Sequence, residues 1–236
     1  MNTPNAMKEL LRLLKLAVQV ARLPMAHLSF ERAIAPAEIA VTYRNFTRPH
    51  PRYWLVPNKA MGMALIHLVA FGGRAAYLKM VRRSGCAAQH ARRASARGYR
   101  LAEIDRNNYV DDIHQINTSL GLRQGRPMDE AYLDKRFRFE DRSNFQYFGV
   151  LNKDGKLVAY CSIAVWGDFA SVDQLLGYQS NDGFMYLLLL EIICRLIDEG
   201  VLRYFMYDTF LGAQPGLRAF KKRFGFQPYR VHYSMR

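Results

Sequence analysis

The second half of the chain, residues 99–236, alternates short apolar segments with amphipathic ones, and this alternation constrains the fold most. Runs rich in β-branched and aromatic side chains predict strands at residues 99–104, 145–151, 157–166, 170–178, 203–207 and 227–233. Helical spacing predicts helices at residues 108–120, 129–138, 183–199 and 216–223, of which the third is strongly apolar and ends at Gly200. An Asp-Gly turn within residues 152–156 predicts a hairpin. The order indicates an α/β fold.

The first hundred residues carry the whole excess of positive charge. The formal net charge is +14; residues 1–100 contain 17 Lys/Arg and 3 Asp/Glu, whereas residues 101–236 contain 17 of each. Such asymmetry indicates a polyanionic partner, either RNA, an acidic carrier protein or an acidic membrane surface, with a basic face kept for solubility as the alternative. The densest part, residues 82–100, has no acid and includes Arg82, Arg83, Arg92 and Arg93.

Residues 1–98 are predicted to form a basic, mainly helical region ahead of a separate domain at residues 99–236. Residues 7–23 have the polar stripe of an amphipathic helix, which either lies in the plane of a membrane surface or packs on the protein's own core. Residues 24–60 interleave arginines with aromatic side chains, which either stack on bases or pack inward. Residues 59–80 are expected to be helical, with an interruption at Gly72-Gly73.

Several features favour a cytoplasmic location. No segment reaches the roughly 18 to 20 uncharged apolar residues of a membrane-spanning helix, and charges interrupt residues 7–23 too often for a signal peptide. Cys86, Cys161 and Cys194 have no paired spacing and no Cys/His cluster, so we expect buried thiols instead of disulfides or a metal site. Peripheral contact of residues 7–23 with the inner face of a membrane stays open.

A short basic helix with a distinctive order of residues lies near the C-terminus. A Gly-Leu pair precedes Phe-Lys and then Phe-Gly, here Gly216, Leu217, Phe220, Lys221, Phe224 and Gly225. Together with the order of elements, this ending resembles the GNAT acyltransferase superfamily, and its FemABX-like branch in particular, over about residues 99–236. The resemblance implies a GNAT-like mixed, mostly antiparallel sheet flanked by helices, here preceded by the basic helical region.

The resemblance also implies a reaction centre where the central strands separate. Lys221, Tyr207 and Asp208 are the catalytic candidates: the lysine could meet a donor phosphate or a developing oxyanion, and Asp208 could orient the incoming amine. Each has a structural alternative, Lys221 as a solvated residue of a basic face and the other two as packed or capping residues. Phe220 and Phe224 lie four residues apart and should face the core, which turns Lys221 toward a flank beside the cleft.

The loop before the long helix departs from the pattern of acetyl-CoA-binding GNAT members. Their loop usually reads Gln/Arg-x-x-Gly-x-Gly/Ala, whereas residues 179–183 read Gln-Ser-Asn-Asp-Gly and contain one glycine. Asp182 is expected to cap the helix, and a carboxylate there would repel a diphosphate. We therefore expect weak coenzyme A binding.

The remaining site candidates follow from the same resemblance. We expect two groups of residues to contact the donor. The first group lies just before the long helix and consists of Tyr178, Gln179, Asn181 and Gly183. The second group, the basic front, lies in the positively charged first hundred residues and consists of Arg82, Arg83, Arg92 and Arg93. Arg123 and Arg126 follow the first expected helix of the domain and could bind an acceptor carboxylate or phosphate bidentately, with surface solvation as the alternative.

The chain is thus expected to be an N-acyltransferase that moves an activated acyl or aminoacyl group onto a primary amine and forms an amide. Aminoacyl-tRNA, an acyl-carrier protein or acyl-CoA would be the donor co-substrate, with no tightly bound cofactor and no metal. FemABX-like proteins usually have two tandem GNAT-like domains, and this chain has length for one. The alternative is a catalytically silent GNAT-like module that binds RNA or an acidic membrane surface.

Overall fold

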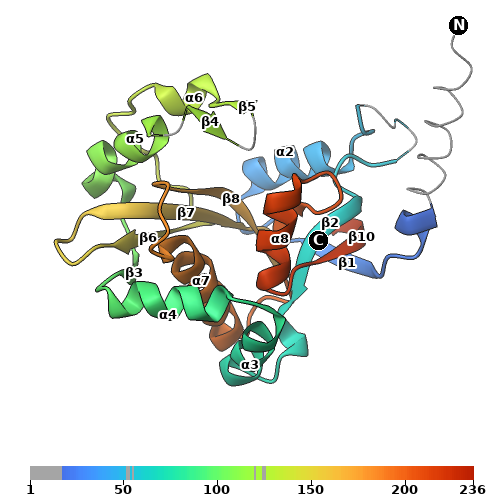
Figure 1. Cartoon of the computed structure of the whole chain (residues 1–236). Coiled ribbons are helices and arrows are strands. Elements are labelled where there is room, and N and C mark those ends of the chain that lie inside the picture. Colours follow the sequence, from blue (N-terminus) through green and yellow to red (C-terminus); the bar gives the residue numbers. More distant parts are fainter. Residues whose placement is uncertain (1–17, 52–53, 55, 120, 124–125) are drawn as a thin grey trace, which may run out of the picture.

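A computed structural model describes residues 18–236, apart from 52–53, 55, 120 and 124–125, and shows one large sheet between two layers of helices (Figure 1). The sheet has eight strands in the order β1-β10-β2-β9-β8-β7-β6-β3. Its strands are β1 (Met25–Phe30), β2 (Met61–His67), β3 (Arg100–Glu103), β6 (Phe145–Leu151), β7 (Leu157–Val165), β8 (Phe169–Gly177), β9 (Tyr204–Thr209) and β10 (Gln227–Met235). The pairs β1–β10 and β8–β9 are parallel and the other neighbours are antiparallel, which confirms the expected mixed, mostly antiparallel α/β fold.

Helices cover both faces of this sheet. They are α2 (Pro36–Thr47), α3 (Arg74–Ser84), α4 (Ala87–Ala96), α5 (Val110–Thr118), α6 (Glu130–Leu133), α7 (Phe184–Glu199) and α8 (Pro215–Arg223). In Figure 1, α3, α4 and α7 lie below the sheet and α2, α5 and α6 above it. A two-stranded hairpin, β4 (Leu122–Arg123) with β5 (Arg126–Pro127), connects α5 to α6.

The long apolar helix α7 is the centre of the largest core. Ten of its residues are buried, and they pack with apolar side chains of α3, α4, β6 and β7. The helix begins at Gly183 and ends at Gly200, both in the left-handed region (φ 88° and 67°), so the expected helix and its glycine stop are confirmed. Because α7 is apolar on nearly all sides, it has to be buried between the sheet on one side and the helices α3 and α4 on the other.

The expected helix over residues 59–80 is wrong in its first half. Met61–His67 forms the strand β2, which pairs with both β10 and β9, and the helix α3 begins only at Arg74. An apolar run of this length that is buried on both faces has the same periodicity as a buried helical turn, so the sequence pattern could not distinguish them. The strands β1 and β2 bring the first hundred residues into the same sheet, which therefore crosses the domain boundary expected at residue 98.

Two aromatic residues of the connecting segment pack inward. Tyr43 and Phe46 of α2 both make edge contacts with Phe30 of β1, at 5.5 and 5.8 Å between ring centroids. Trp54 is exposed, and Tyr53 lies outside the described residues. Most of the expected helix at residues 7–23 also lies outside them. Among the described residues, no helix combines the length and the apolar character required to cross a lipid bilayer.

Candidate functional site

The two central parallel strands separate in the middle of the sheet. β8 and β9 are in register only at Phe169–Tyr204, Ala170–Phe205 and Ser171–Met206, although β8 continues to Gly177 and β9 to Thr209. The register between β7 and β8 shifts at the same place, since Ser162 pairs with Gln174 and Ile163 with Val172. Asp173 is thus the extra residue of a β-bulge. The carboxyl ends of parallel strands that diverge are where ligands bind in α/β sheets.

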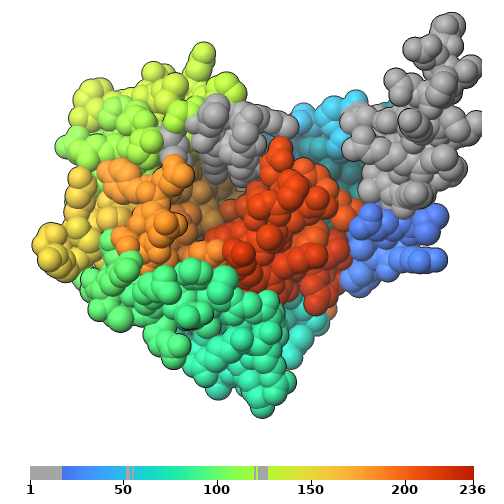
Figure 2. All heavy atoms as spheres, viewed as in Figure 1, coloured from blue at the N-terminus to red at the C-terminus, as the bar shows by residue number. Residues whose placement is uncertain are grey.

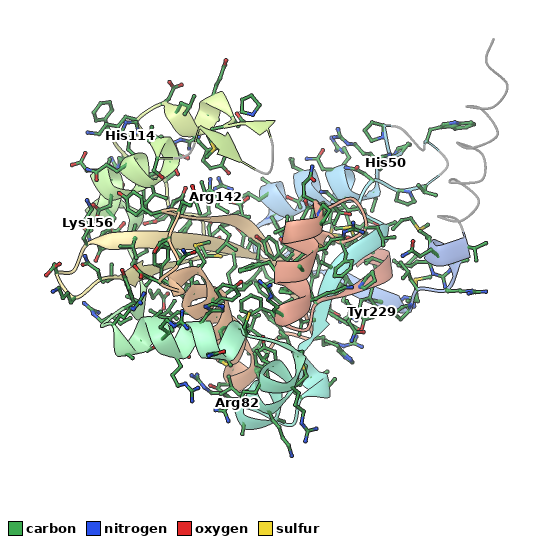
Figure 3. The ribbon with its side chains drawn as sticks, in the orientation of Figure 1. His50, Arg82, His114, Arg142, Lys156 and Tyr229 are labelled. Carbon is green, nitrogen blue, oxygen red and sulfur yellow. The ribbon has the colours of Figure 1, made fainter. Side chains whose placement is uncertain are left out.

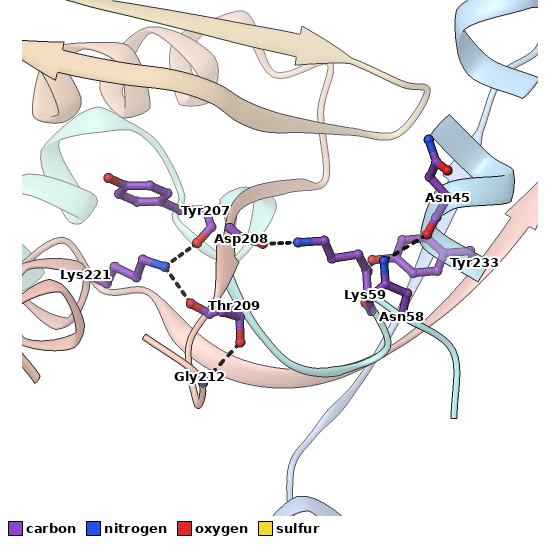
Figure 4. Close-up of polar contacts among 9 residues, drawn as sticks. All are labelled: Asn45, Asn58, Lys59, Tyr207, Asp208, Thr209, Gly212, Lys221 and Tyr233. Atoms are coloured by element: carbon purple, nitrogen blue, oxygen red, sulfur yellow. Dashed lines mark hydrogen bonds and ion pairs between the residues drawn. The ribbon is translucent and has the colours of Figure 1, made fainter. Parts of the chain in front are cut away.

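The three catalytic candidates meet at the end of β9 (Figure 4). Lys221 of α8 donates from Nζ to the main-chain oxygens of Tyr207 and Thr209, both at 2.6 Å, and this Nζ lies 4.5 Å from the centre of the Tyr207 ring. Asp208 lies between these two residues in the chain and has φ 47°. Among the residues that the structure describes, it is the non-glycine residue with a positive φ. Such backbone costs of order 1–3 kcal/mol and persists where its surroundings hold it in place. Here Lys221 bridges the carbonyl groups on both sides of Asp208, and Lys59 pairs with its carboxylate.

Lys221 is buried, with 1% of its surface exposed, so it does not belong to a solvated basic face. Burial is the main reason why the pKa of its ammonium is lowered from 10.5 to about 8; the carboxylate of Asp208 opposes this effect and the cation of Lys59 adds to it. Its neighbour Lys222 is exposed, so the expectation that the cations on this helix differ is confirmed. Phe224 is fully buried as expected, and Phe220 is half-buried against it.

Asp208 turns its side chain away from Lys221 and toward the amino-terminal part of the chain. Its carboxylate forms an ion pair with Lys59, and the main-chain oxygen of Lys59 accepts a hydrogen bond from Tyr233 Oη at 2.8 Å (Figure 4). Lys59 was not singled out from the sequence, because nothing local to residue 59 indicates that β2 carries it next to β9. The sheet order alone brings these groups together.

The donor-loop candidates have different surroundings. Tyr178 is half-buried and donates from Oη to Gln115 Oε1 of α5 at 3.3 Å; burial, and secondly Asp112, raise the pKa of its phenol. Gln179 and Asn181 are exposed. Gly183 is buried, and a Cβ atom there would lie 2.4 Å from the main-chain oxygen of His90 in α4. This glycine therefore permits the close approach of α4 and α7.

Asp182 does not cap α7, which corrects the expectation from sequence. The N-cap residue is Gly183 and has no side-chain cap. The carboxylate of Asp182 instead pairs with Arg97 and accepts a hydrogen bond from Tyr99 Oη at 3.0 Å. The bond from Tyr99 is the main reason why the pKa of Asp182 is lowered. These contacts join the donor loop to the segment between α4 and β3.

The arginines expected on the basic front lie on two adjacent helices. Arg82 and Arg83 are in α3, Arg92 and Arg93 in α4, and all four are exposed; we call them the α3–α4 arginine face. Figure 3 shows Arg82 at the outer end of α3, and in Figure 2 the two helices form one continuous surface below α8. Because α4 contacts Gly183, this face adjoins the start of α7.

The acceptor candidates Arg123 and Arg126 face each other as backbone register partners in the β4–β5 hairpin. Their side chains lie outside the described part of the chain, so their role stays a prediction. The structure describes no group of three or more His, Cys, Asp or Glu side chains that could hold a metal ion among the residues it places.

Comparison with known proteins identifies relatives by structure only, since no family model and no curated protein sequence matches the chain. FemX superimposes with a TM-score of 0.53 at 9% identity, over 71% of this chain and 59% of FemX. The C-terminal domain of a putative lysylphosphatidylglycerol synthetase from Agrobacterium fabrum gives 0.47 at 19% identity, over 70% and 57%. A tandem GNAT protein from the clavulanic acid biosynthesis pathway gives 0.39 at 18% identity, over 56% and 43%.

The chain therefore spans less than three fifths of the length of these proteins. At such identities the likeness concerns the fold. The similarity to FemX shows that this chain shares the fold of that protein, in agreement with the mixed, mostly antiparallel sheet expected from the sequence resemblance.

Proposed function

We propose that this protein is an N-acyltransferase that transfers an aminoacyl group from aminoacyl-tRNA to a primary amine and forms an amide. The observation that carries the proposal is the divergence of β8 and β9 beyond Ser171 and Met206, next to the Asp173 bulge. There the donor carbonyl and the acceptor amine can approach each other from opposite faces of the sheet, and holding two reactants in this way supplies much of the rate enhancement of such reactions.

Two features favour a large polyanionic donor over coenzyme A. The α3–α4 arginine face offers four exposed guanidinium groups to phosphates. The loop before α7, where a diphosphate would bind, carries the paired carboxylate of Asp182, and Gly183 packs closely on the backbone of α4. An acidic acyl-carrier protein fits the same surface, and the FemABX-like resemblance of the sequence places tRNA first.

The chemistry requires little beyond positioning. The neutral amine attacks the ester carbonyl, the carbon–nitrogen bond forms, the ester carbon–oxygen bond breaks, and the departing ribose hydroxyl gains the proton that the amine loses. In our proposal Asp208 and the Tyr207 hydroxyl orient the reacting groups, and Lys221 acts as a positioning residue because its Nζ holds both carbonyl groups that flank Asp208. Tyr178, Gln179 and Asn181 contact the donor, and Arg123 and Arg126 remain proposed acceptor contacts.

The burial of Lys221 supports a second candidate, a catalytically silent module. Its ammonium faces backbone carbonyls and is nearly inaccessible, which is also the arrangement of a purely structural lysine. In that case the α3–α4 arginine face would bind RNA or an acidic membrane surface without any transfer.

Mass spectrometry of amines distinguishes the two candidates. The protein is incubated with a panel of primary amines and with charged tRNA, acyl-carrier protein or acyl-CoA in turn. The proposal predicts a mass gain with charged tRNA, which Asp208→Asn reduces and Asp154→Asn, an exposed acid in the β6–β7 turn, leaves unchanged. A mass gain with acyl-carrier protein or acyl-CoA instead of charged tRNA would show that the proposed donor is wrong. No mass gain with any donor would support the silent module.

A further inference from the structure

A second polar site lies on the opposite face of the sheet from α7. A cavity of about 220 Å³ opens between α5, α6 and the strands β7 and β8. Its lining includes three arginines and two aspartates, namely Arg106, Arg136, Arg142, Asp134 and Asp173. None of these residues was selected from the sequence, and none has a role in the proposed chemistry so far.

Arg106 is held rigidly at the wall of this cavity. Its guanidinium stacks on the ring of Tyr147 at 3.8 Å and donates from Nη2 to Tyr147 Oη at 2.9 Å and to the main-chain oxygen of Glu140 at 2.6 Å. Its Nε is buried and has no hydrogen-bond partner among the described residues. A buried donor without a partner is costly, so a ligand that accepts a hydrogen bond from this Nε would be favoured here.

Arg142 brings a second positive charge to the same cavity. Its Nε forms a long ion pair with Glu38 Oε1 at 3.8 Å, without a hydrogen bond, and its guanidinium lies over Phe145. Figure 3 shows Arg142 between the sheet and the layer formed by α5 and α6. Burial is the main reason why the pKa of Arg106 is lowered; repulsion from Arg142 adds to this effect, whereas Tyr147, Asp141 and Asp173 oppose it. Two guanidiniums that repel each other beside a cavity are an arrangement suited to an anion.

The carboxylates make a simple anion a poor match for the whole cavity. Asp173 is exposed, accepts a hydrogen bond from Ser162 Oγ at 3.2 Å, and is the bulged residue of β8 at the place where β8 and β9 diverge. Asp173 thus lines the cavity, attracts Arg106, and lies in β8 just after Ser171, the last residue of this strand that pairs with β9. A ligand with a cation near Asp173 and an anion near the arginines would satisfy both charges.

We propose that the acceptor is zwitterionic: Arg106 and Arg142 bind a carboxylate or phosphate of the acceptor, and Asp173 binds its reactive ammonium before proton loss. This inference rests on the proposed function and specifies its substrate class. The cavity, at about 220 Å³, is many times larger than the smallest space that holds one water molecule. It therefore accommodates the terminal amine and anion of an acceptor and leaves the remainder outside.

Binding of small probes tests the inference without any donor. Calorimetry compares 4-aminobutyrate with butylamine and butyrate, and O-phosphoethanolamine with ethanolamine, so that the two pairs separate carboxylate from phosphate. We expect at least one zwitterion to bind about 10-fold or more tightly than its single-charge analogues, as expected for a hydrogen bond to a charged group. Arg142→Gln and Asp173→Asn should each remove most of this advantage, whereas Arg32→Gln, an exposed arginine outside the cavity, should not.

Arg106→Gln is a further test, and Arg142→Gln keeps the inference falsifiable if the first variant does not fold. Zwitterions that bind no better than the plain amines, or no binding in the millimolar range, would refute it. If the zwitterion pattern holds but no donor yields a mass gain, the binding site stands and the proposed function fails. If transfer occurs with amines regardless of an anionic group, the function stands and this inference fails.

Discussion

The buried Lys221 predicts an unusual dependence of stability on pH. Because its pKa is lowered from 10.5 to about 8 in the folded protein, the unfolded chain binds more protons at this group between these two values. Stability contributed by the lysine is therefore lowest below about pH 8 and rises as the pH increases through this window. The neutral amine keeps two N–H groups, which is enough for both carbonyl acceptors.

The magnitude follows from the change in pKa. A lowering of this size corresponds to about 3 kcal/mol, since each pH unit contributes about 1.4 kcal/mol. Of this, about 2 kcal/mol is regained between about pH 7 and about pH 9.5. The thiols of Cys161 and Cys194 oppose this trend, because burial raises their pKa and the unfolded chain loses those protons first. The quantity to measure is thus the difference between wild type and Lys221→Met.

Urea unfolding at the two pH values gives that difference directly. The wild type should gain about 2 kcal/mol relative to Lys221→Met between about pH 7 and about pH 9.5, while the exposed control Lys222→Met should follow the wild type throughout. At the lower pH, Lys221→Met removes two hydrogen bonds, which lowers the free energy of unfolding, and removes a buried charge, which raises it. The test is therefore the change in the difference between the two pH values, and not its absolute size at the lower pH. A pH-independent difference between wild type and Lys221→Met would refute the reasoning.

Three further predictions concern the donor side. Replacing all four residues of the α3–α4 arginine face by alanine should weaken tRNA binding and flatten its dependence on salt, measured by filter binding at several salt concentrations; unchanged affinity would remove this face as the docking surface. Calorimetry should show weak coenzyme A binding, and tight stoichiometric binding would reverse the order of donors. Gly183→Ala should destabilise the fold by about 2–4 kcal/mol in urea unfolding, because strain at φ 88° adds to the clash with His90. Gly200→Ala, with φ 67° and open space, should cost only the strain, and equal losses in both variants would contradict the clash.

Much of the architecture is encoded in local patterns. The Asp-Gly hairpin, the apolar helix between Gly183 and Gly200 and the alternation of strands predicted the α/β sheet over residues 99–236, because turn chemistry and periodicity act over a few residues. The helix bearing Phe224 and Lys221 was predicted for the same reason. Charge asymmetry likewise needs no structure, since it is a property of composition.

The order of strands in the sheet could not be deduced in the same way. Met61–His67 was expected to be helical, yet it pairs between β9 and β10 in the middle of the sheet. The pairing energy of such a strand comes from partners about 140 to 165 residues away in the chain, for example Thr209 and Gln227. Local propensity does not contain that information.

The sequence by itself therefore determined the class of fold, the long core helix and the basic front, all of which depend on neighbours within a few positions. Only the tertiary structure decided that Lys221 is buried under Asp208, that Gly183 packs on α4, and that Arg106 and Arg142 share a cavity with Asp173. The physical reason is that burial and charge proximity depend on which distant segments pack together. A lysine on a helix has the same local pattern whether its ammonium meets water or two carbonyl groups.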